Sequence, residues 1–265
     1  DARRARKADD FAAPALERGA GELAQICRTQ PQEGDRSILA SYKLALANAR
    51  DYLYFENQYF RYKDFAALLR GNRRKLKSAG WKRDFHIFVV TNATDGSGRL
   101  TTYEMLAALG KGQLMPSVHK ESAARDPDAA LRKADLEGMN IHVATLWASG
   151  RGAEGIKYKN IYVHSKLLLV DDVFFTLGSA NVNVRSMEGD SELNIACPSP
   201  RLTQQWRKHL WRLHTGVAPG DDVAAEFESW HKLMVRNAKT RKSGGQLLAP
   251  LLEFFDGGTA ILAPD

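Results

Sequence analysis

Two apolar stretches separated by a pair of aspartates constrain the fold of this chain more than any other feature. Ile161–Val170 and Val173–Leu177 are strand-length runs of β-branched residues, leucine and phenylalanine. Only Asp171 and Asp172 lie between them, and aspartate is favoured in tight two-residue turns. The pattern predicts an antiparallel β-hairpin.

The predicted turn also sets a register for the polar residues of this hairpin. If Val170 pairs with Val173, His164 lies opposite Ser179 on the neighbouring strand. Cross-strand partners share a face, and so do residues two apart on one strand. The side chains expected on one face are therefore those of His164, Lys166, Ser179 and Asn181. Asp171 lies in the turn, away from this face, and is predicted to be a structural carboxylate.

This set of side chains suits chemistry at a phosphoryl group. Histidine can act as a nucleophile or as a general acid/base near neutral pH. Lysine, asparagine and serine donate hydrogen bonds without a metal, which suits oxygens that gain charge during phosphoryl transfer. The alternative is a buried strand with a hydrogen-bonded core histidine and a lysine whose stem crosses apolar surface. The number of polar residue types at fixed spacing favours the chemical interpretation.

The spacing His164-x-Lys166-x4-Asp171-x6-Gly178-Ser179-x-Asn181 resembles the HKD signature of the phospholipase D superfamily. Two further stretches, residues 54–60 and 181–192, resemble phospholipase D itself more than the nucleases or cardiolipin synthases of that superfamily. Together, the similar segments cover most of the chain, from Arg36 to Trp211.

The resemblance implies an enzyme in which two HKD motifs meet. One histidine attacks phosphorus and becomes phosphohistidine, and the other protonates the leaving alcohol and then activates water. Since this chain contains one such motif, the resemblance implies either a homodimer or the C-terminal half of a longer bacterial phospholipase D. The identity of the flanking stretches favours the second alternative. His164 would then be the general acid/base, and the N-terminal HKD half would supply the nucleophile.

The resemblance also assigns roles to individual residues. The expected catalytic residues are His164, Lys166, Asp171, Ser179, Asn181 and Glu192. Glu192 is expected to orient His164, and Asp190 is its alternative because residues two apart on a strand share a face. The expected substrate-binding residues are Glu56, Asn57, Gln58 and Asn183. No metal and no other cofactor is expected.

The net positive charge of the chain favours anionic binding partners. A net charge of +7 and a pI near 9.4 suit phospholipid headgroups or nucleic acid. No apolar run has the length of a membrane-spanning helix. We therefore expect a soluble protein with peripheral membrane contact. Some bacterial members of the superfamily are exported and restrained by an inhibitory immunity protein, although no residue here indicates either property.

Alternating helix and strand patterns predict an α/β fold, a mixed β-sheet sandwiched between helices. The catalytic lobe is expected over residues 36–246, after a polar N-terminal connection (1–35) and before a C-terminal tail (247–265). Within the lobe, the segment 149–159 contains three glycines and is expected to be a flexible loop. Residues 93–98 are expected to form another loop, and 127–136 a short helix.

The leading functional hypothesis is a metal-independent phospholipase D. Its substrate would be a glycerophospholipid such as phosphatidylcholine or phosphatidylethanolamine, hydrolysed to phosphatidic acid and the free headgroup. The first alternative is an HKD-type phosphodiesterase acting on nucleic acid, which the basic charge supports. The second is an inactive interaction module, and the presence of every expected catalytic residue type counts against it.

Overall fold

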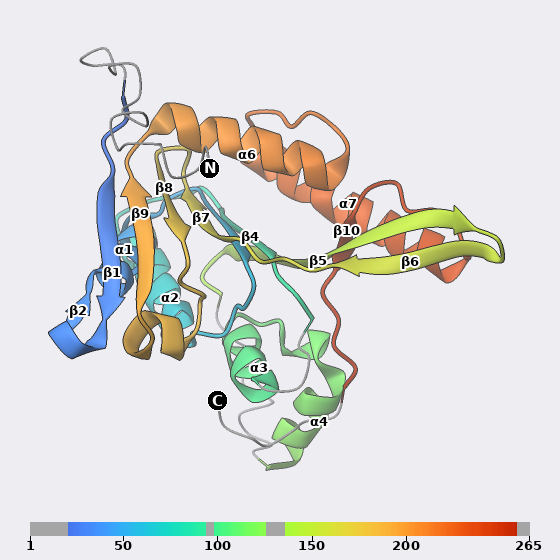
Figure 1. Cartoon of the computed structure of the whole chain (residues 1–265), viewed down its shortest axis with the longest axis horizontal. Coiled ribbons are helices and arrows are strands. Elements are labelled where there is room, and N and C mark those ends of the chain that lie inside the picture. The colour runs from blue at the N-terminus through green and yellow to red at the C-terminus, as the bar shows by residue number, and fades with distance from the viewer. Residues whose placement is uncertain (1–20, 94–97, 126–135, 259–265) are drawn as a thin grey trace, which may run out of the picture.

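The computed structural model describes residues 21–93, 98–125 and 136–258. Their strands form one ten-stranded mixed sheet, in the order β10-β5-β4-β3-β7-β8-β9-β1-β2, with β6 paired to β5 (Figure 1). The strands are β1 (Gln25–Gln30), β2 (Asp35–Arg36), β3 (Tyr52–Asn57), β4 (Phe85–Val90), β5 (Met139–Gly152), β6 (Gly155–Ile161), β7 (Lys166–Val170), β8 (Phe174–Gly178), β9 (Glu192–Cys197) and β10 (Leu251–Glu253).

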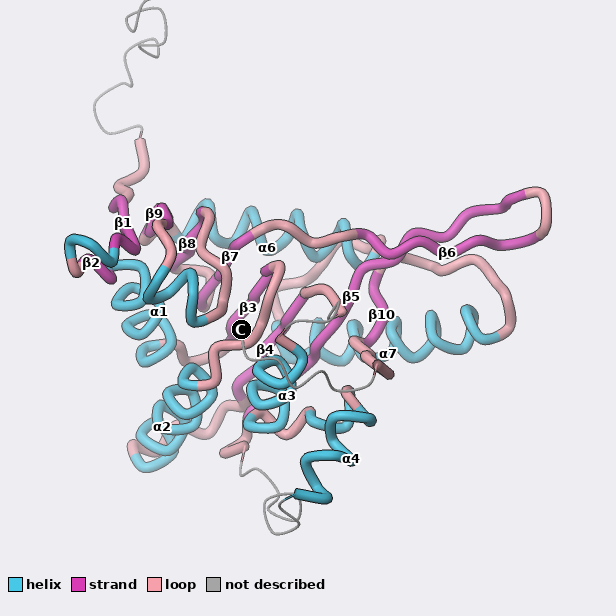
Figure 2. The backbone as a smooth tube through the Cα atoms, turned by 60° about the horizontal axis from the view of Figure 1, so that its bottom comes forward, coloured by secondary structure: helices cyan, strands magenta, loops and turns pink. Residues whose placement is uncertain are grey.

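Helices cover both faces of the sheet, which confirms the predicted fold class (Figure 2). One apolar cluster lies between the sheet and α1, α2 and α3, and the other lies between the sheet and α6 and α7. The α-helices are α1 (Ser37–Asn48), α2 (Asp64–Ser78), α3 (Arg99–Ala108), α4 (Pro116–Arg125), α6 (Pro200–Thr215) and α7 (Val223–Lys242). Shorter helical turns are η2 (Pro31–Glu33), η3 (Gly112–Leu114) and the π-helix η4 (Arg185–Gly189).

The centre of the sheet is buried on both faces. β3, β4 and β5 run parallel to one another, whereas the other strand pairs are antiparallel. All six residues of β4 are buried, as are all five of β7. Strands buried on both faces favour continuous apolar sequences. This explains why the sequence predicted strands at 85–90 and 161–170, although in the second run β7 begins only at Lys166.

Two segments expected to lie outside the catalytic lobe belong to its sheet. Residues 25–30, within the expected connection, form β1 and pair with β9, and Cys27 and Thr29 are both buried. Residues 251–253, within the expected tail, form β10 and pair with β5. The boundaries at 36 and 246 stay a prediction, but the sheet extends across both of them. The loop at 93–98 lies largely outside the described residues, and the helix at 127–136 almost wholly so.

The expected flexible loop at 149–159 is instead a regular β-ribbon. β5 continues to Gly152 and β6 begins at Gly155, with pairs from Leu146–Ile161 to Gly152–Gly155. The chain segment after α7 supports this ribbon, because the Tyr158 hydroxyl donates to the Gly245 carbonyl at 2.5 Å. Glycine content therefore misled the prediction, since a neighbouring segment stabilises the extended conformation.

The predicted hairpin exists, but its register is shifted by one residue. Asp171 and Asp172 both have positive φ, and the Val173 amide donates to the Val170 carbonyl at 2.9 Å, as in a two-residue turn. The ladder, however, pairs Val170 with Phe174, so that Val173 is an extra residue. In addition, β7 begins only at Lys166, and residues 162–165 are not part of a strand. The expected pairing of His164 with Ser179 is therefore wrong.

The described helices do not indicate a membrane span. None of them combines the length and the apolar character that crossing a bilayer requires.

Candidate active site

Four of the predicted site residues meet where β3 ends and β7 begins: Gln58, His164, Lys166 and Asn181. These two strands are antiparallel neighbours, and Asn57 at the end of β3 pairs with Lys166 at the start of β7. The residues that follow β3 and those that precede β7 are consequently at the same edge of the sheet. Gln58 and His164 are brought together in this way.

Lys166 is buried, with 6% of its surface exposed. Its ammonium donates to Gln58 Oε1 at 3.0 Å and to the His164 carbonyl at 2.7 Å. Burial lowers the pKa of Lys166, and the nearby negative charge of Glu192 opposes this shift. The site thus contains a desolvated cation with a carboxylate close enough to stabilise it.

Gln58 connects the polar groups of the site. Its Oε1 accepts from both Lys166 Nζ and Asn181 Nδ2, the latter at 3.4 Å. Its own Nε2 donates to the Tyr162 hydroxyl at 2.7 Å. An ammonium and an amide therefore converge on a single oxygen atom. That arrangement can bind one oxygen of an anionic group.

His164 is exposed, and its backbone carbonyl accepts from the same Lys166 ammonium that donates to Gln58. Its imidazole stacks on Tyr162, with ring centroids 6.4 Å apart and an interplanar angle of 26°. Within the described part of the chain, the ring nitrogens make no hydrogen bond. They are therefore available to a substrate or to a group from another chain.

Ser179 points toward β9 rather than across the hairpin. Its hydroxyl donates to the Glu192 carboxylate, which also accepts from the Ser186 hydroxyl at 2.6 Å. Gly178 permits this close approach, because a Cβ there would lie 2.2 Å from the Leu193 carbonyl oxygen. Glu192 makes no hydrogen bond to His164 among the described residues, so its predicted orienting role stays a prediction.

Two of the predicted substrate-binding asparagines are buried and hold the backbone. Asn57 Oδ1 accepts from the Tyr59 and Val182 amides at 3.3 and 3.2 Å, and Asn183 Oδ1 accepts from the Ser186 amide at 2.9 Å. In the described residues, Asn57 Nδ2 and Asn181 Oδ1 are buried without a partner. Together with the His164 ring nitrogens, these two atoms are hydrogen-bonding groups of the site that have no described partner.

Glu56 faces the opposite side of the sheet, toward α6. Its carboxylate accepts from the Ser165 hydroxyl at 2.6 Å and from the Tyr54 hydroxyl, and it lies 2.9 Å from His214 Nε2. Burial opposes its ionisation, but His214 and the two hydroxyls together lower the pKa of Glu56 below 4.5. Glu56 thus holds the segment that carries His164, and its direct contact with substrate stays a prediction.

His214 and Ser165 are the residues of this network that the sequence did not reveal. His214 lies in the last turn of α6, and Gly216, with a φ of 75°, caps the C-terminus of this helix. It is 158 positions from Glu56, so that no local pattern links the two. Ser165 could have been found from the sequence, because it is a polar residue between His164 and Lys166. Alternation along an extended chain places its side chain on the face opposite theirs.

Asp171 is bound to the backbone, as predicted for a structural carboxylate. Its oxygens accept from three consecutive amides, those of Arg50, Asp51 and Tyr52, at 2.7, 2.9 and 2.8 Å. Burial raises the pKa of Asp171, and these hydrogen bonds oppose the shift. This carboxylate therefore fixes the hairpin turn against the start of β3.

Metal-ligating side chains do not cluster in the described residues: no group of three or more His, Cys, Asp or Glu has an arrangement that could hold an ion.

A model of the family "Cardiolipin synthase, PLD-like domain" matches residues 42–214. Phospholipase D alpha 4 from Arabidopsis thaliana is 46% identical over 78 residues, covering 26% of this chain and 10% of that protein. Phospholipase D alpha 2 from the same plant is 28% identical over 231 residues, covering 69% of this chain and 28% of that protein. The chain thus corresponds to well under half of the length of either relative.

Solved structures with a similar course of the chain include two bacterial proteins. NucT from Helicobacter pylori has 14% identity and a TM-score of 0.44, with 71% of this chain and 93% of that chain covered. Nuc from Salmonella typhimurium, described as a phospholipase D family member, has 17% identity and a TM-score of 0.42, with coverages of 71% and 91%.

Proposed function

The chain belongs to the family "Cardiolipin synthase, PLD-like domain". On this basis, we propose that it is the catalytic lobe of a phospholipase D. The reaction would be hydrolysis of a glycerophospholipid at its distal phosphodiester bond, giving phosphatidic acid and the free headgroup. Phosphatidylcholine and phosphatidylethanolamine are the proposed substrates.

One observation carries this proposal: two donors converge on one oxygen, and one of them, Lys166, also bonds to the backbone carbonyl of the exposed His164. Lys166 Nζ and Asn181 Nδ2 both donate to Gln58 Oε1. If the Gln58 side chain turned away, a non-bridging phosphoryl oxygen in place of its Oε1 would receive a charge-assisted hydrogen bond and a neutral one. The ring nitrogens of His164 would then face the bond that breaks.

The proposed reaction has two steps and needs a second histidine. The second histidine attacks phosphorus, and His164 gives its proton to the leaving headgroup alcohol, so that a phosphohistidine forms. His164 then takes a proton from water, which attacks phosphorus and releases the second histidine. The second motif would come from an N-terminal half or from another copy of this chain.

The choice of lipid over nucleic acid is supported by the relatives, because several that align over 230 residues or more are named phospholipase D. The competing proposal is a nuclease, which the net charge of +7 supports. Both substrates are phosphodiesters, and the histidine chemistry would be common to them. Substrate identity is consequently the point to test.

The test compares headgroup release with DNA cleavage in the enzyme assembled with its second motif. Vesicles of phosphatidylcholine and phosphatidylethanolamine are one substrate, and single-stranded and double-stranded DNA are the others. We expect headgroup release from vesicles, loss of this activity in His164→Ala, and intact DNA. Cleavage of DNA without headgroup release would replace the lipid proposal with the nuclease.

A further inference from the structure

The ribbon formed by residues 147–161, called the arm below, projects from the body of the protein. Figures 1 and 2 show its two strands extending beyond the rest of the sheet, with α7 alongside. Register pairs run along it from Trp147–Asn160 to Gly152–Gly155. The chain passes from its last residue, Ile161, directly into the segment that carries His164.

One face of the arm is attached to the segment at and after the end of α7. The Arg241 guanidinium lies 3.9 Å from the centre of the Trp147 ring, and the Ser149 hydroxyl accepts from the Leu247 amide at 2.8 Å. Tyr158, which pairs with Ser149, donates to the Gly245 carbonyl from the same face. The arm is therefore held in a defined position and is not a free hairpin.

The opposite face carries two exposed lysines. Lys157 pairs with Gly150 and Lys159 with Ala148, so that no large neighbour across the ribbon covers them. Lys157 forms an ion pair with Glu154 at 2.8 Å, but both side chains are largely exposed, and such pairs are weak. Lys159 has no ion pair with any described residue. The face is thus open and positively charged.

Ile161 continues this face toward the site, and Tyr162 follows it directly, outside the strand. Ile161 is 39% exposed and Tyr162 is 54% exposed. Lysine, tyrosine and an exposed aliphatic residue are the combination found where proteins meet the bilayer interface. There the lysine stem lies along apolar groups while its ammonium stays among headgroups, and tyrosine occupies the boundary.

We infer that the open face of the arm, with Lys157, Lys159 and Ile161, docks on the surface of an anionic lipid bilayer. This inference rests on the proposed lipid substrate, which it supplements with a surface that holds the bilayer beside His164. A rigid ribbon suits a flat surface because its lysines reach the headgroups together without an ordering penalty for the backbone.

The test is binding of the double variant Lys157→Ala/Lys159→Ala to vesicles, measured by co-sedimentation. Vesicles of phosphatidylcholine with added phosphatidylglycerol are compared with vesicles of phosphatidylcholine alone. Each lysine near an anionic surface contributes about 1 kcal/mol, so losing both should weaken binding to the anionic vesicles about thirtyfold. Binding to the neutral vesicles should change little.

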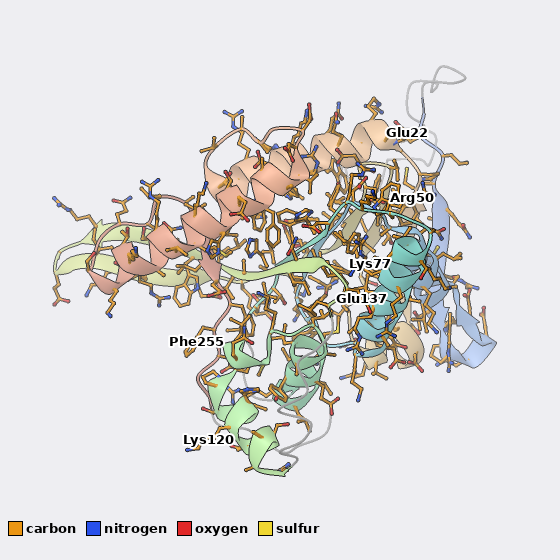
Figure 3. All side chains as sticks on the ribbon, turned by 180° about the vertical axis from the view of Figure 1, so that it is seen from behind. Glu22, Arg50, Lys77, Lys120, Glu137 and Phe255 are labelled. Atoms are coloured by element: carbon orange, nitrogen blue, oxygen red, sulfur yellow. The ribbon has the colours of Figure 1, made fainter. Side chains whose placement is uncertain are left out.

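The matched control is Lys43→Ala/Lys75→Ala, which removes the same charge from exposed positions on α1 and α2. Lys77, labelled in Figure 3, marks the end of α2, which lies away from the arm. This control should bind anionic vesicles within about twofold of the unmodified protein, since long-range charge is screened. Equal losses in the two double variants would overturn the inference, because they would reflect net charge alone.

Two further readouts separate this inference from the proposed function. Turnover of a short-chain, monomeric phosphatidylcholine should be unchanged in the arm variant, because the arm does not contact the reacting groups. Vesicle binding is measured without catalysis, so an enzyme that fails to release headgroups can still bind through the arm. Loss of single-stranded DNA binding with unchanged vesicle binding would assign the arm to nucleic acid and overturn the inference.

Discussion

The two ends of the β7–β8 hairpin carry polar residues of the same motif but use them differently. At the turn, Asp171 accepts three backbone amides, and Asp172 pairs with the buried Arg207 through two contacts of 2.7 Å. At the open end, the His164 ring is exposed, and Asn181 Oδ1 lacks a partner among the described residues. Saturated groups hold a structure in place, whereas groups with spare capacity can bind a ligand.

The largest expected effect is that of His164→Ala at the open end. Removing an exposed imidazole should lower kcat at least about a thousandfold, because proton transfer to the leaving group is lost. The melting temperature should stay within about two degrees, since no core volume is removed. The measurement is headgroup release by the assembled enzyme together with thermal unfolding. Retained turnover in this variant would show that the exposed His164, at the open end of the hairpin, does not take part in the reaction.

Glu192→Gln should have the next largest effect. Its carboxylate accepts from Ser179 and Ser186 and lies near Lys166. Loss of the charge should lower kcat about a hundredfold, as for other carboxylates that orient a catalytic group.

The neighbouring carboxylate provides a matched control for Glu192. Asp190 pairs with the exposed Arg185 at 3.2 Å, so that Asp190→Asn should change kcat less than about threefold. Initial rates of both variants decide the assignment. A large loss at Asp190 with little at Glu192 would reverse it.

Asp171→Asn tests the turn end of the hairpin. One Asp171 oxygen accepts from Arg50 and the other from Asp51 and Tyr52, and an amide nitrogen cannot replace either acceptor. We expect a loss of about 2 kcal/mol in the free energy of unfolding, with near-normal turnover per folded molecule. Denaturant unfolding and active-site titration measure the two quantities. A large loss of turnover in fully folded protein would give Asp171 a role in the reaction.

The smallest expected effect is a pH-dependent one at Glu56. Its pKa is lower in the folded protein than the ordinary 4.5, so its charge stabilises the fold above that pH, and this stabilisation is lost as the pH falls through the folded-state pKa. Glu56→Gln should therefore be less stable by about 1 kcal/mol at pH 6, and the difference should narrow below pH 4.5.

The control for this experiment is Glu228→Gln, at an exposed position on α7. Its stability should follow that of the unmodified protein at every pH. A Glu56→Gln difference that is the same at pH 6 and pH 4 would mean that charge is not what Glu56 contributes to this network.

The local sequence pattern was sufficient to predict those parts of the molecule whose structure depends mainly on residues near in sequence. The strand at 85–90 was predicted at its observed bounds, because a strand buried on both faces must be apolar throughout. Asp171 was assigned to structure from its place in a turn. The family was also predicted from the motif spacing and is confirmed, while the narrower assignment to a bacterial C-terminal half stays a prediction.

Tertiary contacts decided the features on which prediction failed. The three glycines of the arm predicted a flexible loop, but contacts with Arg241 and Gly245 stabilise it as a β-ribbon. The hairpin register depends on Val173, an extra residue between the paired positions Val170 and Phe174. The turn and strand propensities of the residues do not predict this insertion.

By itself, the sequence determined which chemical groups this protein has and the fold class that carries them, because periodicity and motif spacing are local properties of the chain. Only the tertiary structure decided which of these groups meet. Glu56 and His214 are 158 positions apart and lie 2.9 Å from each other across a strand and a helix. Such a contact depends on how the sheet and α6 pack, and packing is a property of the whole chain.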